Sequence, residues 1–152
     1  MTEPTPGKRT ELSSLGEFGL IRHLTEAFTI EQPSTIKGIG DDAAVLDYGN
    51  KATLVSTDLL VEGVHFDLAY MPLKHLGYKC AAVNFSDIVA MNGTPRQLFV
   101  GISVSNRFPV EALDEIYEGI RLACKRYHVD LAGGDTTSSV HGLFLSLTVT
   151  GD

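Results

Sequence analysis

Four acidic segments of this 152-residue chain place aspartate beside glycine or hydroxyl residues, a pattern typical of an oxygen-rich cation site. They are Gly40-Asp41-Asp42, Ser56-Thr57-Asp58, Asn84-Phe85-Ser86-Asp87 and Gly133-Gly134-Asp135-Thr136-Thr137. Glycine lets a ligand approach the backbone closely, and carboxylate and hydroxyl oxygens are the hard donors that Mg²⁺ prefers. Taken singly, each stretch is equally typical of a turn or a helix cap.

Convergence of these acids would separate the two interpretations. Two carboxylates about 4 Å apart repel each other by roughly 4 kcal/mol at an effective dielectric constant near 20. A cluster of four therefore needs protons or cations between the carboxylates, so a shared location would indicate metal binding. The sequence spacing by itself leaves both interpretations open.

Asp87 is the most informative of these positions. It lies in the apolar segment AAVNFSDIVAM, where Asn84 and Asp87 are three residues apart and share one face of the expected helix. An unpaired carboxylate is costly to bury. We therefore expect Asn84 and Asp87 on a polar stripe that faces a ligand, with a solvated stripe as the alternative.

Residues 38–45, GIGDDAAV, match the dinucleotide fingerprint G-x-G-x-x-G/A as a string. That fingerprint must follow a strand and open a helix. Here no convincing strand is predicted before the segment, a strand is predicted after it, and two carboxylates would repel a pyrophosphate. The P-loop pattern G-x-x-x-x-G-K-[ST] does not occur in the sequence. A nucleotide site would therefore have to be centred on a metal ion.

His65, in VEGVHFDL, follows Asp58 by seven residues, close enough to share its pocket. Its ring could donate a hydrogen bond to a substrate phosphate, and a purely structural histidine is the alternative. Cys80 and Cys124 are far apart in helix-like segments, so we expect reduced core thiols.

The elements that must position these residues follow from hydrophobic periodicity. Helices are predicted over residues 16–28, 72–91 and 109–127, and strands over 43–48, 52–60, 97–105, 129–134 and 142–150. The glycines at 133 and 134, at the end of the predicted strand 129–134, are expected to form a turn. Because the strands do not alternate strictly with helices, we expect an α+β fold with helices packed on one face of a mixed or antiparallel sheet.

Composition further narrows the classes of protein to which this chain could belong. The chain is 43% hydrophobic and 20% charged with a net charge of −7, which is typical of one globular domain and argues against nucleic-acid binding. The sequence offers no membrane-length apolar run and no secretory signal, so we expect a cytoplasmic protein. Residues 1–15 are expected to be a disordered lead-in to a domain over 16–152. The chain stops directly after a predicted strand, which suggests a fragment of a longer protein.

Five segments, in register, resemble the N-terminal half of the thiamine-monophosphate kinases. They are GEFGLI (16–21), GIGDDAAV (38–45), STDLLVEGVHF (56–66), KHLGYKCAAVNFSDIVAMNGTPR (74–96) and DLAGGDTTSS (130–139). These kinases share a superfamily with aminoimidazole ribonucleotide synthetase, selenophosphate synthetase and a hydrogenase maturation protein. The resemblance implies ATP binding without a P-loop, and an N-terminal α+β domain that pairs in a homodimer to form a β-barrel.

By this resemblance, the γ-phosphoryl group of ATP is transferred to the phosphate of thiamine monophosphate, giving thiamine diphosphate and ADP. Several Mg²⁺ ions are implied, and the positions that match their ligands are Asp42, Ser56, Thr57, Asp58, Asp87 and Asp135. Tyr117, Gly134 and Asp135 match ATP contacts, His65 matches a substrate contact, and Asp41 is a weaker match that would orient the loop. Phosphoryl transfer depends on positioning and on cations, so no separate catalytic residue is assigned.

The family's C-terminal domain is missing from this sequence, so we expect the chain alone to turn over poorly or not at all. One alternative is another ATP-binding member of the superfamily, such as a selenophosphate or aminoimidazole ribonucleotide synthetase. EGVHF followed by NFSDIVAMNG favours the thiamine kinase. A non-catalytic dimerisation module is the other alternative.

Overall fold

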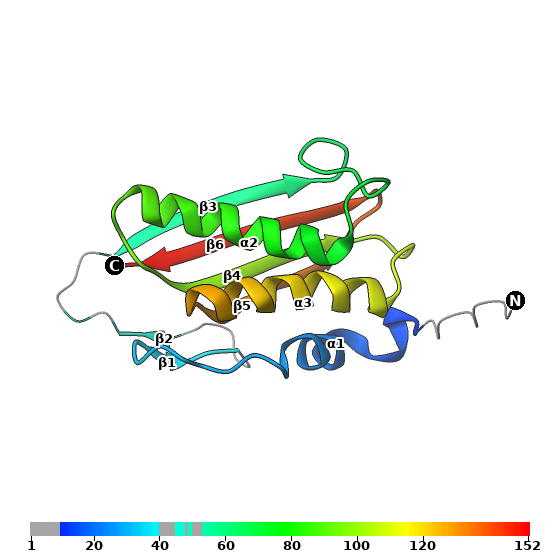
Figure 1. The fold of residues 1–152 in the computed structure, drawn as a ribbon. Coiled ribbons are helices and arrows are strands. Elements are labelled where there is room, and N and C mark those ends of the chain that lie inside the picture. Colours follow the sequence, from blue (N-terminus) through cyan, green and yellow to red (C-terminus); the bar gives the residue numbers. More distant parts are fainter. Residues whose placement is uncertain (1–9, 40–44, 48, 50–52) are drawn as a thin grey trace, which may run out of the picture.

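A four-stranded sheet covered on one face by two long helices dominates the computed structural model (Figure 1). The structure describes residues 10–39, 45–47, 49 and 53–152. The strands are β3 (Leu54–Val61), β4 (Pro95–Val104), β5 (Asp130–Ser138) and β6 (Leu143–Gly151), and the covering helices are α2 (Leu73–Ala90) and α3 (Val110–Tyr127). Their order is β3-β6-β4-β5, with β6 antiparallel to both of its neighbours and β5 parallel to β4. The predicted α+β class with a mixed sheet is confirmed, and the sheet of the single chain is open rather than closed into a barrel.

The remaining elements lie before this sheet in the sequence. A 3-10 turn, η1 (Leu12–Ser14), leads into α1 (Gly16–Thr25), which lies beside α3. β1 (Thr35–Lys37) and β2 (Val45–Leu46) form a separate antiparallel pair, and β1 contacts β5. Within the described residues, no helix has both the length and the apolar character that a membrane span would need.

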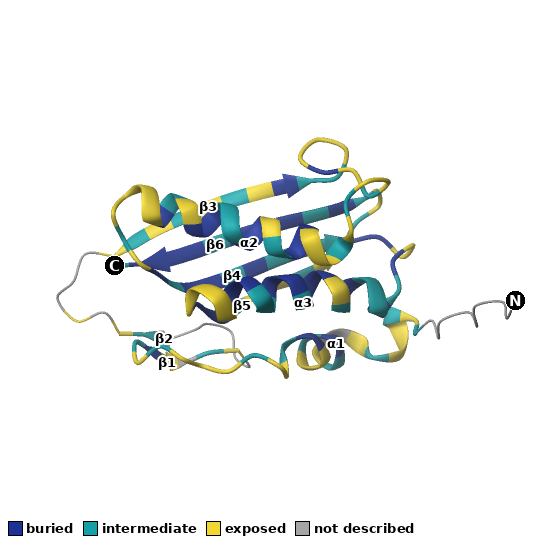
Figure 2. Cartoon of the chain, in the orientation of Figure 1, coloured by how far each residue is buried: buried dark blue, intermediate teal, exposed yellow. Residues whose placement is uncertain are grey.

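The core lies between the sheet and the two helices, as the buried residues in Figure 2 show. Alternate residues of β4 and β6 are buried on this face, and the pairs Leu98–Val149, Val100–Leu147 and Ile102–Leu145 lie opposite one another. This period-two pattern is that of a sheet with one covered face. The other face is open, and on β3 it exposes Val55 by 63% and Leu59 by 56%.

Both cysteines belong to this core. Cys80 on α2 and Cys124 on α3 are buried and free, as predicted from the sequence. Burial raises the pKa of each thiol to about 12, because a thiolate would be poorly solvated there.

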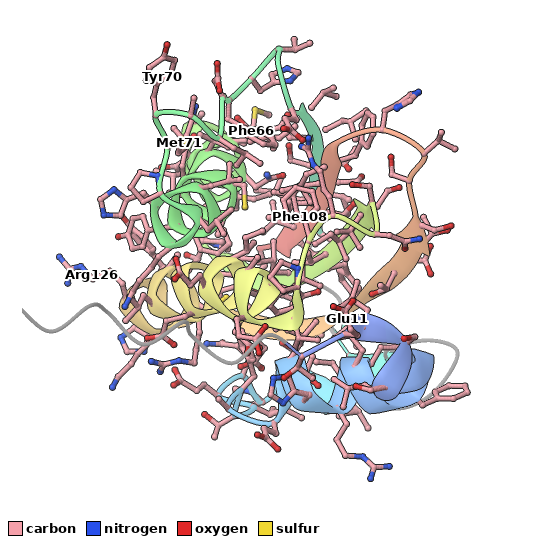
Figure 3. The ribbon with its side chains drawn as sticks, turned by 90° about the vertical axis from the view of Figure 1, so that its right-hand side faces the viewer. Glu11, Phe66, Tyr70, Met71, Phe108 and Arg126 are labelled. Carbon is pink, nitrogen blue, oxygen red and sulfur yellow. The ribbon has the colours of Figure 1, made fainter. Side chains whose placement is uncertain are left out.

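Two glycines allow α2 and α3 to touch backbone to backbone. A Cβ atom added at Gly77 would lie 1.9 Å from the carbonyl oxygen of Ile116, and one added at Gly119 would lie 2.0 Å from that of Lys74. The end-on view shows the two helices side by side over the sheet (Figure 3). The lateral position of α2 over β3 therefore depends on this contact.

A buried carboxylate attaches the N-terminal segment to the sheet. Asp130, at the start of β5, is 1% exposed. It accepts hydrogen bonds from the backbone N–H groups of Glu31 (2.6 Å) and Gln32 (2.9 Å) and from the hydroxyl of Thr35 (2.9 Å). A carboxylate at this depth is stable only with such donors, which in turn fix the entry into β1.

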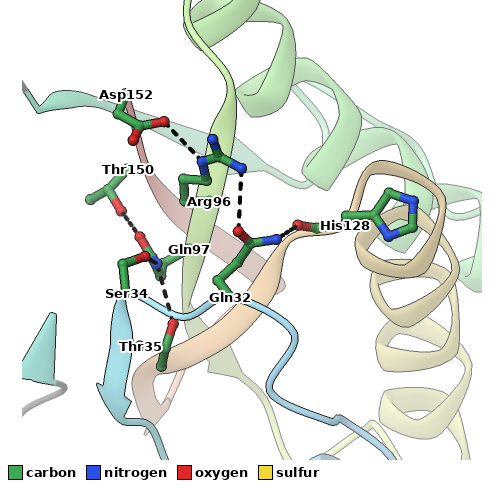
Figure 4. A network of polar contacts seen from close by, with 8 residues as sticks. All are labelled: Gln32, Ser34, Thr35, Arg96, Gln97, His128, Thr150 and Asp152. Carbon is green, nitrogen blue, oxygen red and sulfur yellow. Dashed lines mark hydrogen bonds and ion pairs between the residues drawn. The ribbon is translucent and has the colours of Figure 1, made fainter. Parts of the chain in front are cut away.

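The contacts in Figure 4 extend this attachment across β4 and β6. The Gln97 side chain donates to the hydroxyls of Ser34 (2.9 Å) and Thr35 (3.2 Å) and accepts from the hydroxyl of Thr150 (2.8 Å). Arg96 on the same strand pairs with Asp152 at 2.9 Å. Because several of these groups are buried, the network fixes one position of β1 relative to the sheet.

Three sequence predictions need correction. Residues 133 and 134 were predicted to form a turn but lie inside β5, because Gly134 packs against Val100 so closely that a Cβ would lie 1.9 Å from its carbonyl oxygen. A strand, β1, does precede GIGDDAAV, although β2 follows it, so the strand-turn-helix context of a dinucleotide site is still not met. The helix predicted over 16–28 ends at Thr25.

The expected lead-in over residues 1–15 is also ordered in part. Thr10 donates its N–H to Glu111 at 2.9 Å, and Leu12 and Leu15 pack against the core. The packed part of the chain therefore begins no later than Thr10, whereas residues 1–9 lie outside the described residues.

Gly77→Ala or Gly119→Ala should lower the free energy of unfolding by about 1–3 kcal/mol, because the new methyl group overpacks a backbone contact. Gly19→Ala on α1 is the matched control, since its Cβ would meet only Leu15 at an ordinary 3.5 Å. We expect the control to be neutral or stabilising by up to about 1 kcal/mol. Denaturant unfolding measures all three, and equal stabilities would contradict the described helix contact.

Asp130→Ala should cost about 3 kcal/mol, because it leaves buried donors without an acceptor. Amide hydrogen exchange at Glu31 and Gln32 should accelerate as the segment detaches. The control is Asp67→Ala, which removes an exposed carboxylate that accepts one N–H, from Ala69 at 2.8 Å. An Asp130 variant as stable as the Asp67 variant would disprove the anchoring role.

Candidate functional site

Two of the predicted acidic segments, Ser56-Thr57-Asp58 and Asn84-Phe85-Ser86-Asp87, meet where α2 crosses β3. The Ser56 hydroxyl on β3 donates to Oδ2 of Asp87 on α2, at 2.8 Å. Ser56 and Asp58 lie opposite Val149 and Leu147 of β6, whose side chains are buried under the helices. Ser56 and Asp58 therefore point to the helix-covered face, the side from which Asp87 approaches.

The surroundings of this group are polar and partly open. Ser56, Asp58 and Asp87 are all half-buried, at the edge of the core rather than inside it. Ser56 and Asp58 are two residues apart on an extended strand, so their Cα atoms are roughly 7 Å apart. Two carboxylates and a hydroxyl are hard oxygen donors that suit Mg²⁺. Among the residues that the structure describes, no group of three or more acidic, histidine or cysteine side chains could hold a metal ion.

Asn84 does not share the ligand-facing stripe that its spacing from Asp87 predicted. It is fully buried, and its amide donates to the Cys80 carbonyl one turn earlier, at 2.9 Å. Its side-chain oxygen has no hydrogen-bond partner among the described residues. Asp87, three residues later on α2, is only half-buried, so the two predicted neighbours are a core amide and a partly exposed carboxylate.

Thr57 projects from the opposite face of β3. Its hydroxyl donates to the Leu147 carbonyl at 3.0 Å and accepts from the Thr148 hydroxyl at 2.9 Å. The side chains of Ser56 and Thr57 therefore cannot meet the same ion. A metal contact from Thr57 would have to come from its main-chain carbonyl, and it stays a prediction.

Asp135 lies far from the Ser56–Asp87 pair within one chain. It is exposed on β5 and in register with Gly101 of β4. β5 and β3 are the two edges of the sheet, separated by three strand spacings or about 14 Å. Gly134 beside it has a structural reason to be glycine, its tight contact with Val100. The ATP contacts predicted for Gly134 and Asp135 remain predictions.

Tyr117 is buried on the core side of α3. Burial is the main cause that raises the pKa of its phenol, with a smaller contribution from Cys80. The phenol therefore stays protonated and can act as a hydrogen-bond donor. The predicted ATP contact of Tyr117 is not tested by this geometry.

His65 is exposed in the loop after β3, and a hydrogen bond from the backbone holds its ring. The backbone N–H of Val61 donates to Nδ1 at 3.0 Å, so Nδ1 is the acceptor and the ring proton is on Nε2. Lys79 of α2 donates to the His65 carbonyl at 3.2 Å. Among the described residues the Nε2–H group has no hydrogen-bond partner, so it can donate to an oxygen anion.

Asp41 and Asp42 lie outside the described residues. Their segment joins β1 to β2, which pair antiparallel with Thr35 opposite Leu46. The predicted metal ligand Asp42 and the loop role of Asp41 therefore remain predictions.

Sequence reasoning overlooked two polar residues that organise this region, Glu62 and Asp130. Glu62, directly after β3, accepts the N–H of Leu143 at 2.8 Å and pairs with Arg107. The sequence does contain a signal for Asp130, because an acid inside the apolar run VDLA is expected to be buried. A buried carboxylate needs hydrogen-bond partners.

Comparison of this sequence with known proteins assigns it to a family and agrees with the fold described above. Residues 40–152 match the family described as AIR synthase related protein, N-terminal domain. A thiamine-monophosphate kinase of Bacillus subtilis (strain 168) is 40% identical over 139 residues, which cover 91% of this chain and 42% of that relative. The chain spans about two-fifths of the length of the curated relatives it matches.

Solved structures give the same picture. The thiamine-monophosphate kinase from Stenotrophomonas maltophilia K279a is 34% identical with a TM-score of 0.75, covering 90% of this chain and 42% of that one. AaThiL complexed with AMPPCP and TMP is 33% identical with a TM-score of 0.65, covering 97% of this chain and 44% of that one. The resemblance to the N-terminal half of the thiamine-monophosphate kinases is thereby confirmed, and the chain belongs to the AIR synthase related protein family as its N-terminal domain.

Proposed function

We propose that the protein carrying this domain is a Mg²⁺-dependent thiamine-monophosphate kinase that transfers the γ-phosphoryl group of ATP to thiamine monophosphate, forming thiamine diphosphate and ADP. The observation that carries the proposal is the Ser56–Asp87 hydrogen bond beside Asp58, which joins two of the kinase-like motifs at one point of the fold. The relatives support it by name, and one related structure holds an ATP analogue together with TMP, which we take as thiamine monophosphate.

The donor set fits a hard cation, with Asp58 and Asp87 as its ligands and Ser56 beside them. When bound, Mg²⁺ neutralises phosphate oxygens and so favours phosphoryl transfer. The Ser56 hydroxyl occupies Oδ2 of Asp87 and thereby orients the carboxylate, leaving Oδ1 available. His65 would hold the substrate by donating from Nε2 to an oxygen anion.

Asp42, Thr57 and Asp135 remain proposed metal ligands, and Tyr117, Gly134 and Asp135 remain proposed ATP contacts. Because Asp135 is on the far edge of the sheet, its role with a metal requires a separate ion or a second copy of the chain. We keep the homodimer as part of the proposal. The exposed apolar side chains of Val55 and Leu59 on the open face support it, since such a face is typically covered by a partner.

We further propose a cytoplasmic enzyme in which residues 1–152 alone turn over poorly or not at all. The matched relatives are more than twice as long as this chain, which supports a need for further residues. Appreciable kinase activity from residues 1–152 would refute that part of the proposal.

Asp87→Asn in the full-length protein should reduce Mg²⁺-dependent binding of AMPPCP, and with it kinase turnover, by at least about tenfold, because one ligand charge is lost. Calorimetric titration at several Mg²⁺ concentrations measures the binding. Asp114→Asn is the matched control, since Asp114 is a half-buried helical aspartate paired with His23 at 2.8 Å. Equal Mg²⁺ dependence of AMPPCP binding in the wild type and the Asp87 variant would contradict the assignment of Asp87 as a metal ligand.

A further inference from the structure

Glu62 connects three loops at the end of the sheet that carries His65. Its backbone N–H donates to the Leu143 carbonyl at 3.1 Å, and its Oε2 accepts the N–H of Leu143 at 2.8 Å. Its Oε1 forms an ion pair with Arg107. The loop after β3, the connection from β4 to α3 and the turn from β5 to β6 thus meet at one carboxylate.

Arg107 is itself tied to the core. Its guanidinium lies 4.9 Å from the centre of the Phe108 ring, and the Phe108 side chain is buried. Phe66, three residues after Gly63 in the neighbouring loop, is also buried, and Figure 3 labels both rings. An isolated exposed ion pair contributes little, but here the charges are fixed by a ring and by a backbone N–H.

Gly142 provides independent evidence that the fold fixes the position of the Glu62 side chain. Its φ is +73°, a left-handed conformation that favours glycine, and a Cβ there would lie 3.1 Å from Oε2 of Glu62. The turn before β6 therefore leaves room for this carboxylate. The Glu62 side chain is only 21% exposed, so its two oxygens need the partners that they have.

Hydrogen bonds within the loop that follows Glu62 connect the position of Glu62 to that of His65. The N–H of Gly63 donates to the Phe66 carbonyl at 2.8 Å, and the N–H of His65 donates to the Val61 carbonyl at 2.9 Å. Together with the hydrogen bond from Val61 to Nδ1, these contacts leave the His65 ring one orientation. A shift of Glu62 would move both ends of this short turn.

We propose that the Glu62–Arg107 pair positions His65, and that it thereby sets the affinity for the phosphate-bearing substrate without affecting ATP. Glu62 acts through the loop as a positioning residue and touches no reacting atom. The inference rests on the proposed function, because it takes His65 as the substrate contact. The chemistry recognised is the anionic phosphate of thiamine monophosphate, met by the N–H at Nε2.

The test uses Glu62→Gln and Arg107→Met in the full-length protein. Glu62→Gln keeps an acceptor for Leu143 and removes only the charge, and Arg107→Lys is the conservative variant expected to restore function. Glu118→Gln and Arg121→Met are matched controls, because this pair, at 2.7 Å, lies along α3 itself. The measurements are kcat, the KM values for both substrates, and amide hydrogen exchange at Val61, Gly63 and His65.

We expect Glu62→Gln and Arg107→Met to raise the KM for thiamine monophosphate about fivefold, as for one weakened hydrogen bond. The KM for ATP and kcat should stay within about twofold, and exchange should accelerate only in the 61–65 loop. Faster exchange with an unchanged KM would overturn the proposal, as would equal rises in both KM values or equal effects of the control variants.

A wild type that does not phosphorylate thiamine monophosphate would refute the proposed function without deciding this inference. Calorimetric binding of thiamine monophosphate then decides it. Binding about fivefold weaker in both variants, with the controls unchanged, supports the positioning role. Equal binding by wild type and variants, or no binding by any of them, rejects it.

Discussion

The close contact between α2 and α3 is the constraint on which the rest of the structure depends. Gly77 and Gly119 let the two backbones touch, and the paired helices then cover one face of the sheet as a single layer. The position of that layer sets how far Asp87 stands from Ser56 on the edge strand β3. A bulkier residue at either glycine would push α2 away from α3 along the sheet and disturb the Ser56–Asp87 hydrogen bond that joins the two acidic motifs.

The same arrangement explains why polar groups gather at the rim of the domain. The helix-covered face is filled by apolar side chains of β4 and β6, so the carboxylates described above lie where α2 passes the edge strand or are surrounded by hydrogen-bond donors. Asp58 and Asp87 illustrate the first case and Asp130 the second. Asp58 and Asp87 are half-buried on either side of Ser56 and suit a cation, whereas Asp130 is already satisfied by three donors from residues 31, 32 and 35.

Much of the architecture could be predicted from the sequence, because hydrophobic periodicity is local. The long helices and the strands β3, β4 and β6 follow it closely. β1 was missed because three residues carry too little pattern. β5 was cut short because Gly134 is required by a contact with Val100, far away in the sequence.

The candidate site was predictable in part for the same reason. The strand period of two already places Ser56 and Asp58 on one face and Thr57 on the other. The separation of Asp135 from them depends on strand order, which no local pattern contains. Glu62 was overlooked because its partners, Arg107 and Leu143, come from distant parts of the chain.

The central claim is that Asp58 and Asp87 hold the cation that accompanies ATP. The most direct test is a crystal structure of the full-length protein with AMPPCP and Mn²⁺, in which anomalous scattering locates the ions. The account predicts an ion with carboxylate oxygens of both Asp58 and Asp87 at about 2.1–2.2 Å, close to the distance for Mg²⁺. Nucleotide-bound ions that contact neither carboxylate would contradict it.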